Sequence, residues 1–176
     1  MLLGSCWMKE MTHESLLALG RDGNPALWGA LQELEWEVPE PSNETIESLE
    51  IDYCRLLIGP KGHLSPVESV WVSDQFQSET VSAMQSFFDL LPGYRPPISL
   101  HDHIGVQLDY AGNLLVAAGK SQDEAAFEPV LVFCQNRLAW IDGLLRGVNS
   151  LAQTDFYRGL ATATGHWVAN ASDLSE

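Results

Sequence analysis

The sequence is short of basic residues and of cysteines, and each shortage excludes classes of function. Its 176 residues include 9 Lys and Arg against 24 Asp and Glu, a net charge of −15. A chain this acidic is poorly suited to neutralising phosphates, so we expect it to bind neither nucleic acid nor an anionic membrane surface. The three cysteines match no zinc-binding or CxxC spacing, and their odd number argues against a disulfide framework. Cys54 and Cys134 lie among apolar residues, so we expect both to fill a core.

Long apolar runs are also missing. No stretch approaches the roughly 18 consecutive apolar residues of a membrane-spanning helix, which argues against direct insertion into a membrane. The N-terminal residues lack the basic segment and apolar core of a secretory signal. These two observations predict a cytoplasmic protein.

The acidic residues that are present concentrate early in the chain. No Lys or Arg lies between Arg21 and Arg55, whereas the window 22–52 is rich in Asp and Glu. Three interpretations remain open for this acidic window: a solvated face, a docking surface for a basic partner segment, or an adaptation to high salt.

The apolar residues recur with helical spacing almost throughout, and 45% of the chain is hydrophobic. We therefore predict one all-α domain over residues 1–176, a bundle of about seven or eight helices. In the first third, Thr12 is positioned to cap a helix that ends near Gly20, and Asn24 with Pro25 to start the next. Ser42 or Asn43 should cap a helix that ends at Gly59.

The later helices are predicted from similar signals. Ser65-Pro66-Val67-Glu68 has the form of a capping box and predicts a short helix. Further helices are expected over 79–91 and 100–119, and over a segment after Pro129 that reaches Leu145. A last helix should start near Thr154.

One polar cluster could carry chemistry, namely His101, Asp102 and His103. The two imidazoles and the carboxylate could bind a metal ion, although their spacing on a helix separates them. Asp102 could instead cap the helix that follows, or Asp102 and His103 could bind a partner. The chain has no GxSxG, P-loop or GxGxxG motif, so we predict no nucleophilic centre and no cofactor.

Tryptophan is abundant, with six residues. We expect most of them in the core, and any exposed ones would suit a groove for an apolar helix or peptide.

Three segments resemble the TorD/DmsD/NarJ family of redox-enzyme maturation chaperones. Residues 53–60 (YCRLLIGP) followed by residues 65–71 (SPVESVW) resemble its "LFxGP … PxxSV" signature. Asp102-His103 is similar to its "EPxDH" motif, and residues 156–160 (FYRGL) are similar to its "FYRxL" element. The resemblance covers roughly residues 50–168, with the three segments in the family's order.

The resemblance implies a cytoplasmic chaperone that is not an enzyme. Such a protein binds the apo catalytic subunit of a molybdenum or tungsten oxidoreductase, together with its twin-arginine signal peptide, while cofactor is inserted before export. It also implies a monomer or a domain-swapped dimer. Carried over onto this chain, the client-binding residues would be Trp71, Asp102 and His103, with Gly59 and Pro60 shaping a loop beside them, whereas Tyr157 and Arg158 would brace the fold.

Two alternatives come from other classes of protein. The chain could be a helical adaptor of unrelated function, or a metal-dependent hydrolase that uses His101, Asp102 and His103.

Overall fold

The computed structural model describes residues 2–20, 32, 36–76, 79–121 and 123–172. Within these residues the chain forms nine α-helices and no strand, which confirms the all-α prediction. The helix predicted to start at Asn24 lies outside the described residues. The helices are α1 (Leu2–Met8), α2 (His13–Leu19), α4 (Asn43–Tyr53), α5 (Glu68–Ser73), α6 (Glu79–Phe88), α7 (Ile104–Gly119), α8 (Glu128–Arg137), α9 (Ile141–Leu151) and α10 (Asp155–Ser172), with a π-helical turn at Cys54–Ile58 and a 3-10 turn at Glu124–Phe127.

The chain divides into two compact units, each assembled from segments that are distant in the sequence. Unit 1 contains Met1–Met8, Ser65–Gly143 and Trp167–Glu176. Unit 2 contains Lys9–Leu64 and Leu144–His166. Two of the four boundaries between the units fall within α9 and α10, and the other two follow Met8 and Leu64.

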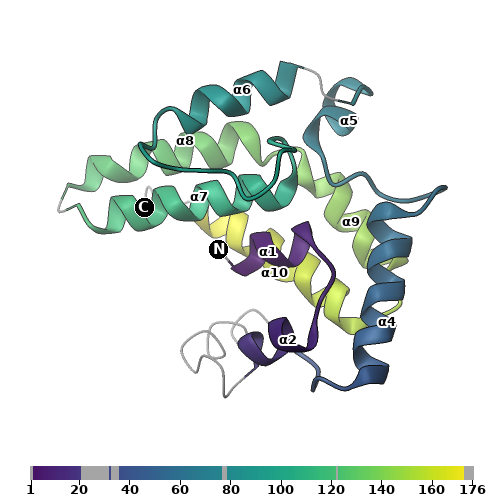
Figure 1. Cartoon of the computed structure of the whole chain (residues 1–176). Helices are drawn as coiled ribbons and strands as arrows, with labels where there is room; N and C mark the ends of the chain where they lie inside the picture. Colours follow the sequence, from purple (N-terminus) through teal and green to yellow (C-terminus); the bar gives the residue numbers. More distant parts are fainter. Residues whose placement is uncertain (1, 21–31, 33–35, 77–78, 122, 173–176) are drawn as a thin grey trace. The chain divides into compact units, whose positions relative to one another are not determined.

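Unit 1 is built around α7, ten of whose sixteen residues are buried. In Figure 1, α8 runs beside α7, and α1 also packs against α7. The close approach of α1 depends on Gly4 and Gly105, because a Cβ atom on Gly4 would overlap the carbonyl oxygen of Gly105. On another face of α7, Tyr110 contacts the rings of Phe88 and Phe133 at 5.4 and 4.9 Å between centroids. This contact between aromatic rings joins α6, α7 and α8 in one core.

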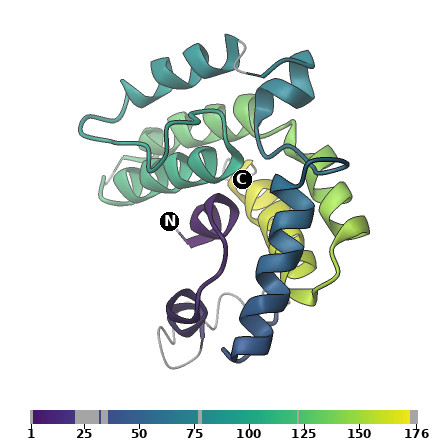
Figure 2. The same cartoon turned by 45° about the vertical axis from the view of Figure 1, so that its right-hand side comes forward.

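Unit 2 carries two of the predicted helix caps. The Thr12 side chain accepts from the Ser15 amide in a complete capping box, and Ser42 caps α4 through the Thr45 amide. The apolar face of α4 and the π-turn is buried at Leu49, Tyr53, Leu56 and Leu57. Figure 2 shows α4, in blue, beside the start of α10, in yellow-green. Asp52 of α4 accepts hydrogen bonds from the amides of Gln153 and Thr154, just before α10.

Two expectations about individual segments were wrong, and one helix was missed. Helix α1 was not predicted at all. The helix expected to reach Leu145 is two helices, since α8 ends at Arg137 and α9 begins at Ile141. Cys134 is buried as predicted, but Cys54 is exposed, and its thiol donates a hydrogen bond to the Glu10 carboxylate at 3.0 Å.

Candidate functional site

Two of the motif segments identified from the sequence meet in unit 1. The Ile104 amide donates to the Pro66 carbonyl at 2.8 Å, and the Glu68 amide donates to the Asp102 carbonyl at 3.0 Å. These bonds form an isolated antiparallel bridge between Val67 and His103. We call this pairing of residues 66–69 with 102–104 the motif junction.

Asp102 supports the motif junction from inside. It is 1% exposed, and its carboxylate accepts from the Ser69 amide at 3.0 Å and from the Thr80 hydroxyl at 3.1 Å. The free amides at a helix N-terminus need acceptors, and a carboxylate is a strong one. Asp102 therefore caps α5, whereas the interpretation of Asp102 as a helix cap placed it on the helix that follows it in sequence.

His103 is the actual N-cap of α7. Its Nδ1 accepts from the Gly105 amide at 3.0 Å, and the side chain is 4% exposed. Burial lowers the pKa of His103 to about 4, against the opposing influence of the Asp102 charge. The imidazole is therefore neutral at physiological pH, as its role as an acceptor requires.

Glu68 has a different role from the one we predicted. Val67 is the N-cap of α5 and makes no side-chain cap, so Glu68 completes no capping box. Its carboxylate is instead buried, 2.5 Å from the Arg137 guanidinium and 2.6 Å from the Gln107 amide nitrogen. Burial raises the pKa of Glu68, although Arg137 and the Gln107 hydrogen bond act in the opposite direction. No signal in the sequence linked residues 68 and 137.

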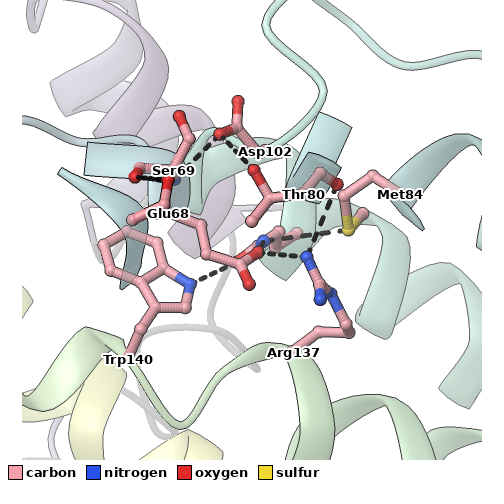
Figure 3. A network of polar contacts seen from close by, with 9 residues as sticks. Glu68, Ser69, Thr80, Met84, Asp102, Arg137 and Trp140 are labelled. Carbon is pink, nitrogen blue, oxygen red and sulfur yellow. Dashed lines mark hydrogen bonds and ion pairs between the residues drawn. The ribbon is translucent and has the colours of Figure 1, made fainter. Parts of the chain in front are cut away.

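The hydrogen bonds of Glu68 continue on both sides into one connected set, which we call the buried polar network. On one side, Gln107 Oε1 accepts from the Trp140 indole at 2.9 Å. On the other, Arg137 reaches the Thr80 carbonyl at 3.5 Å, and the Thr80 hydroxyl leads to Asp102. Figure 3 shows the Glu68 side chain between the Arg137 guanidinium on one side and the Trp140 indole on the other. Sequence reasoning missed Gln107, Arg137 and Trp140 as site residues.

Trp71 lies on α5 at the exposed side of this region. Its indole donates to the Ser65 carbonyl at 2.7 Å, and its ring lies 6.5 Å from that of Trp140. It is 38% exposed, and two further apolar side chains close to it in sequence, Val72 and Phe76, are 62% and 61% exposed. We call Trp71, Val72 and Phe76 the apolar patch. All three lie within residues 71–76, and large apolar side chains left exposed close to one another in the chain suit a binding surface.

The remaining predicted residues lie elsewhere. Gly59 and Pro60 belong to unit 2, where the Gly59 amide closes the π-turn on the Cys54 carbonyl. Tyr157 is fully buried in unit 2, and Arg158 bonds Asp155 and the Ala152 carbonyl, so both support the fold as expected.

His101, which the hydrolase interpretation needs, packs edge-on against the Phe88 ring at 5.3 Å. Within the described part of the chain, no three His, Cys, Asp or Glu side chains gather in a way that could hold a metal ion. Nor is any helix there long and apolar enough to cross a bilayer.

The fold and the motif junction define an all-α protein that joins the two resembling segments of unit 1 and exposes an aromatic surface beside them. The family model described as nitrate reductase delta subunit matches residues 21–146, well over half of the chain. The chain therefore belongs to this family, the NarJ/TorD-type redox-enzyme maturation chaperones, which confirms the resemblance seen in the sequence. No curated protein and no solved structure gives a significant match.

Proposed function

We propose that this chain is a cytoplasmic chaperone that binds the apo catalytic subunit of a molybdenum or tungsten oxidoreductase. It recognises the subunit's twin-arginine signal peptide, holds the apoprotein while cofactor is inserted, and catalyses no chemical step itself. Membership of the redox-enzyme maturation family supports the class of client. The observation that carries the proposal is the apolar patch, three exposed apolar residues on and just after α5, next to the motif junction.

The chemistry of the patch suits a peptide of this kind. A twin-arginine signal peptide joins two guanidinium groups to an apolar stretch, so its receptor needs carboxylates beside an apolar surface. The patch supplies the apolar part through Trp71, Val72 and Phe76. Asp74 and Glu79 are exposed and close to it in the sequence. We assign the apolar stretch to the patch and the arginine pair to these carboxylates.

Asp102 and His103 act indirectly in this scheme, because both are buried. Asp102 caps α5 and so fixes the helix that carries Trp71, while His103 caps α7. Gly59 and Pro60 shape a loop in unit 2 that we propose as a second client contact.

The test is capture of the client from the native host. Tagged native chain and the double variant Trp71→Ala/Phe76→Ala are used as baits, and bound proteins are identified by mass spectrometry. The matched control is Leu90→Ala/Val116→Ala, which removes two exposed apolar side chains elsewhere in unit 1. We expect a molybdenum or tungsten oxidoreductase subunit to be enriched by the native chain and the control, and lost with the patch variant. Equal capture by all three baits, or no such subunit with any, would reject the proposal.

The carboxylate assignment has its own test. Asp74 has a positive φ of 55°, a conformation that Asn also tolerates, so Asp74→Asn removes the charge without backbone strain. We expect Asp74→Asn to weaken binding of a synthetic peptide with two adjacent arginines before a Leu/Ala-rich stretch. Binding of a control peptide, in which two lysines replace the arginines, should be less affected. Unchanged affinity for the arginine peptide would remove Asp74 from the site.

A further inference from the structure

We propose that Gln107 is a positioning residue for the client surface, because it fixes Trp140, which in turn fixes the exposed ring of Trp71. The inference rests on the proposed function, in which Trp71 contacts the client. None of the sequence motifs includes Gln107 or Trp140. Gln107 is 0% exposed, so it reaches the surface only through other side chains.

The first step is the orientation of the Gln107 amide. An indole N–H can only donate and a carboxylate can only accept, so the two neighbours of Gln107 require opposite ends of its amide. The amide oxygen therefore faces the Trp140 Nε1 at 2.9 Å, and the amide nitrogen faces the Glu68 carboxylate at 2.6 Å. If the amide were turned around, the Glu68 carboxylate and the Trp140 N–H would both lose their Gln107 partner. An unpaired polar group in the interior costs free energy, so this orientation of the amide is strongly favoured.

The second step is the anchor behind Gln107. Glu68 is held by Arg137 at 2.5 Å, and that guanidinium reaches the Thr80 carbonyl. The Nε of Arg137 is buried with no hydrogen-bond partner among the described residues. A buried ion pair that leaves a donor unpaired contributes little to stability, and a role in fixing geometry accounts for it better.

The third step leads from Trp140 to the surface. The Trp71 ring has three neighbours that restrict its rotation: the Ser65 carbonyl, the Trp140 ring and Gly143. A Cβ atom on Gly143 would lie 2.8 Å from Trp71 Cζ3, so the indole lies directly against the glycine backbone. Among these described neighbours, only the Trp140 ring is itself held by a hydrogen bond from the buried polar network, the bond to Gln107.

A fixed exposed indole has a consequence for binding. An aromatic side chain that already occupies its bound rotamer loses little conformational freedom when a partner docks on it. Losing that advantage weakens affinity by about two- to tenfold.

The experiment uses the full chain labelled with 5-fluorotryptophan, whose fluorine resonances are assigned by single Trp→Phe changes. The variant Gln107→Met keeps the length of the side chain and removes both hydrogen bonds. Its control is Gln85→Met, which makes the same change at an exposed position on α6. Gly143→Ala serves as the reference for a displaced Trp71 ring. Trp36, which lies in unit 2, reports general unfolding.

We expect Gln107→Met to shift or broaden the Trp71 resonance, as Gly143→Ala does, while Trp36 is unchanged and the Gln85→Met spectrum matches the native one. Trp140→Phe, which removes only the indole donor, should give the same result and decides the question if Gln107→Met fails to fold. An unmoved Trp71 resonance in either folded variant would overturn the inference.

Affinity for the synthetic arginine-pair peptide separates this inference from the proposed function. Gln107→Met should weaken binding about two- to tenfold, whereas Gln85→Met should not. If Trp71→Ala leaves affinity unchanged, the proposed function fails whatever the spectra show. If Trp71→Ala weakens binding but Gln107→Met changes neither the Trp71 resonance nor affinity, only the positioning role fails.

Discussion

Asp52 and His103 are both buried titratable residues, and their contacts oppose protonation in different ways. Asp52 is 0% exposed and accepts from the amides of Gln153 and Thr154, the Thr154 hydroxyl and the Arg55 guanidinium. Burial by itself raises the pKa of Asp52, but the hydrogen bonds from Thr154, Arg55 and Gln153 together outweigh it, and the pKa is lowered. His103 uses an unprotonated ring nitrogen as an acceptor. Each residue therefore makes stability depend on pH over its own range.

We predict that Asp52→Asn lowers the free energy of unfolding by about 2–4 kcal/mol at pH 7, because an amide cannot accept all the hydrogen bonds that the carboxylate accepts. The native pKa of Asp52 is depressed, so its contribution is complete above the unfolded-state pKa near 3.8 and disappears as the pH falls through the native pKa. Urea unfolding of the native chain and of Asp52→Asn should therefore show a difference in the free energy of unfolding that becomes smaller in acid.

Asp155→Asn is the control for Asp52. Its side chain is 88% exposed and forms a surface ion pair with Arg158, so its removal should change stability by less than about 1 kcal/mol. A loss for Asp52→Asn no larger than that of Asp155→Asn would contradict the prediction.

For His103, the prediction concerns a milder pH range. The native pKa is about 4 and the ordinary value is 6.5, so the unfolded chain takes up a proton that the folded chain does not. Stability should fall by up to roughly 3 kcal/mol as the pH drops from 6.5 to 4, with little effect above that range. His103→Ser keeps a side-chain cap but has no titrating group. Urea midpoints measured against pH should lose this slope in His103→Ser; an unchanged slope would show that other groups cause it.

At the scale of elements, α1 depends on a close contact with α7. Cys6 and Trp7 of α1 are buried at 2% and 0% exposure. The contact requires glycine at position 4, where a Cβ atom would overlap the Gly105 carbonyl and lie 3.1 Å from the Asp109 amide nitrogen. Backbone atoms of a helix cannot move aside individually, so a larger residue has to displace the whole of α1.

We predict that Gly4→Ala destabilises the protein by about 1–3 kcal/mol and increases hydrogen exchange in residues 2–8. Gly119→Ala is the matched control, since a Cβ atom there has no neighbour within 4 Å and alanine favours the helix. The control should be neutral or slightly stabilising. Protection of α1 that is equal in Gly4→Ala and the native chain would refute the argument.

The elements that were predicted correctly carry their signals locally. Thr12 and Ser42 cap their helices through amides three residues ahead, and the sequence contains both partners. The misses depend on distant partners. Glu68 completes no capping box because α5 begins at Glu68 itself, and its carboxylate bonds Arg137 and Gln107 instead. Asp102 caps α5, and His103 caps α7. A sequence pattern cannot show which of two local roles a long-range contact will override.

The residues of the candidate site likewise divide into those that the sequence indicated and those that it did not. Resemblance to the family indicated Trp71, Asp102 and His103, and the structure brings the first two together through α5. Gln107, Arg137 and Trp140 have no distinguishing pattern in the sequence, because a buried glutamine on a helix is recognised only by its neighbours. The sequence therefore did not predict the residues that lie behind the exposed Trp71 ring.

At the scale of the whole molecule, the net charge of −15 should act on the rate of association. Summed charge attracts an oppositely charged partner over distances set by salt, about 30 Å at 0.01 M and about 8 Å at 0.15 M ionic strength. A peptide with an arginine pair should therefore associate several-fold more slowly at the higher ionic strength, while its dissociation rate stays nearly constant. Stopped-flow fluorescence with the arginine-pair peptide measures both rates.

The same experiment distinguishes two interpretations of the acidic window 22–52. Glu44, Glu47 and Glu50 are exposed on α4, and changing all three to Gln keeps the helix while removing three charges. If the window is a solvated face that guides the peptide electrostatically, the triple variant slows association at low salt, leaves dissociation unchanged, and matches the native chain at high salt. If the window is a docking surface, the variant speeds dissociation at every salt concentration, because contacts in the bound complex are lost. We predict the first outcome, since the apolar patch, and not this helix, combines exposed aromatic rings with nearby carboxylates.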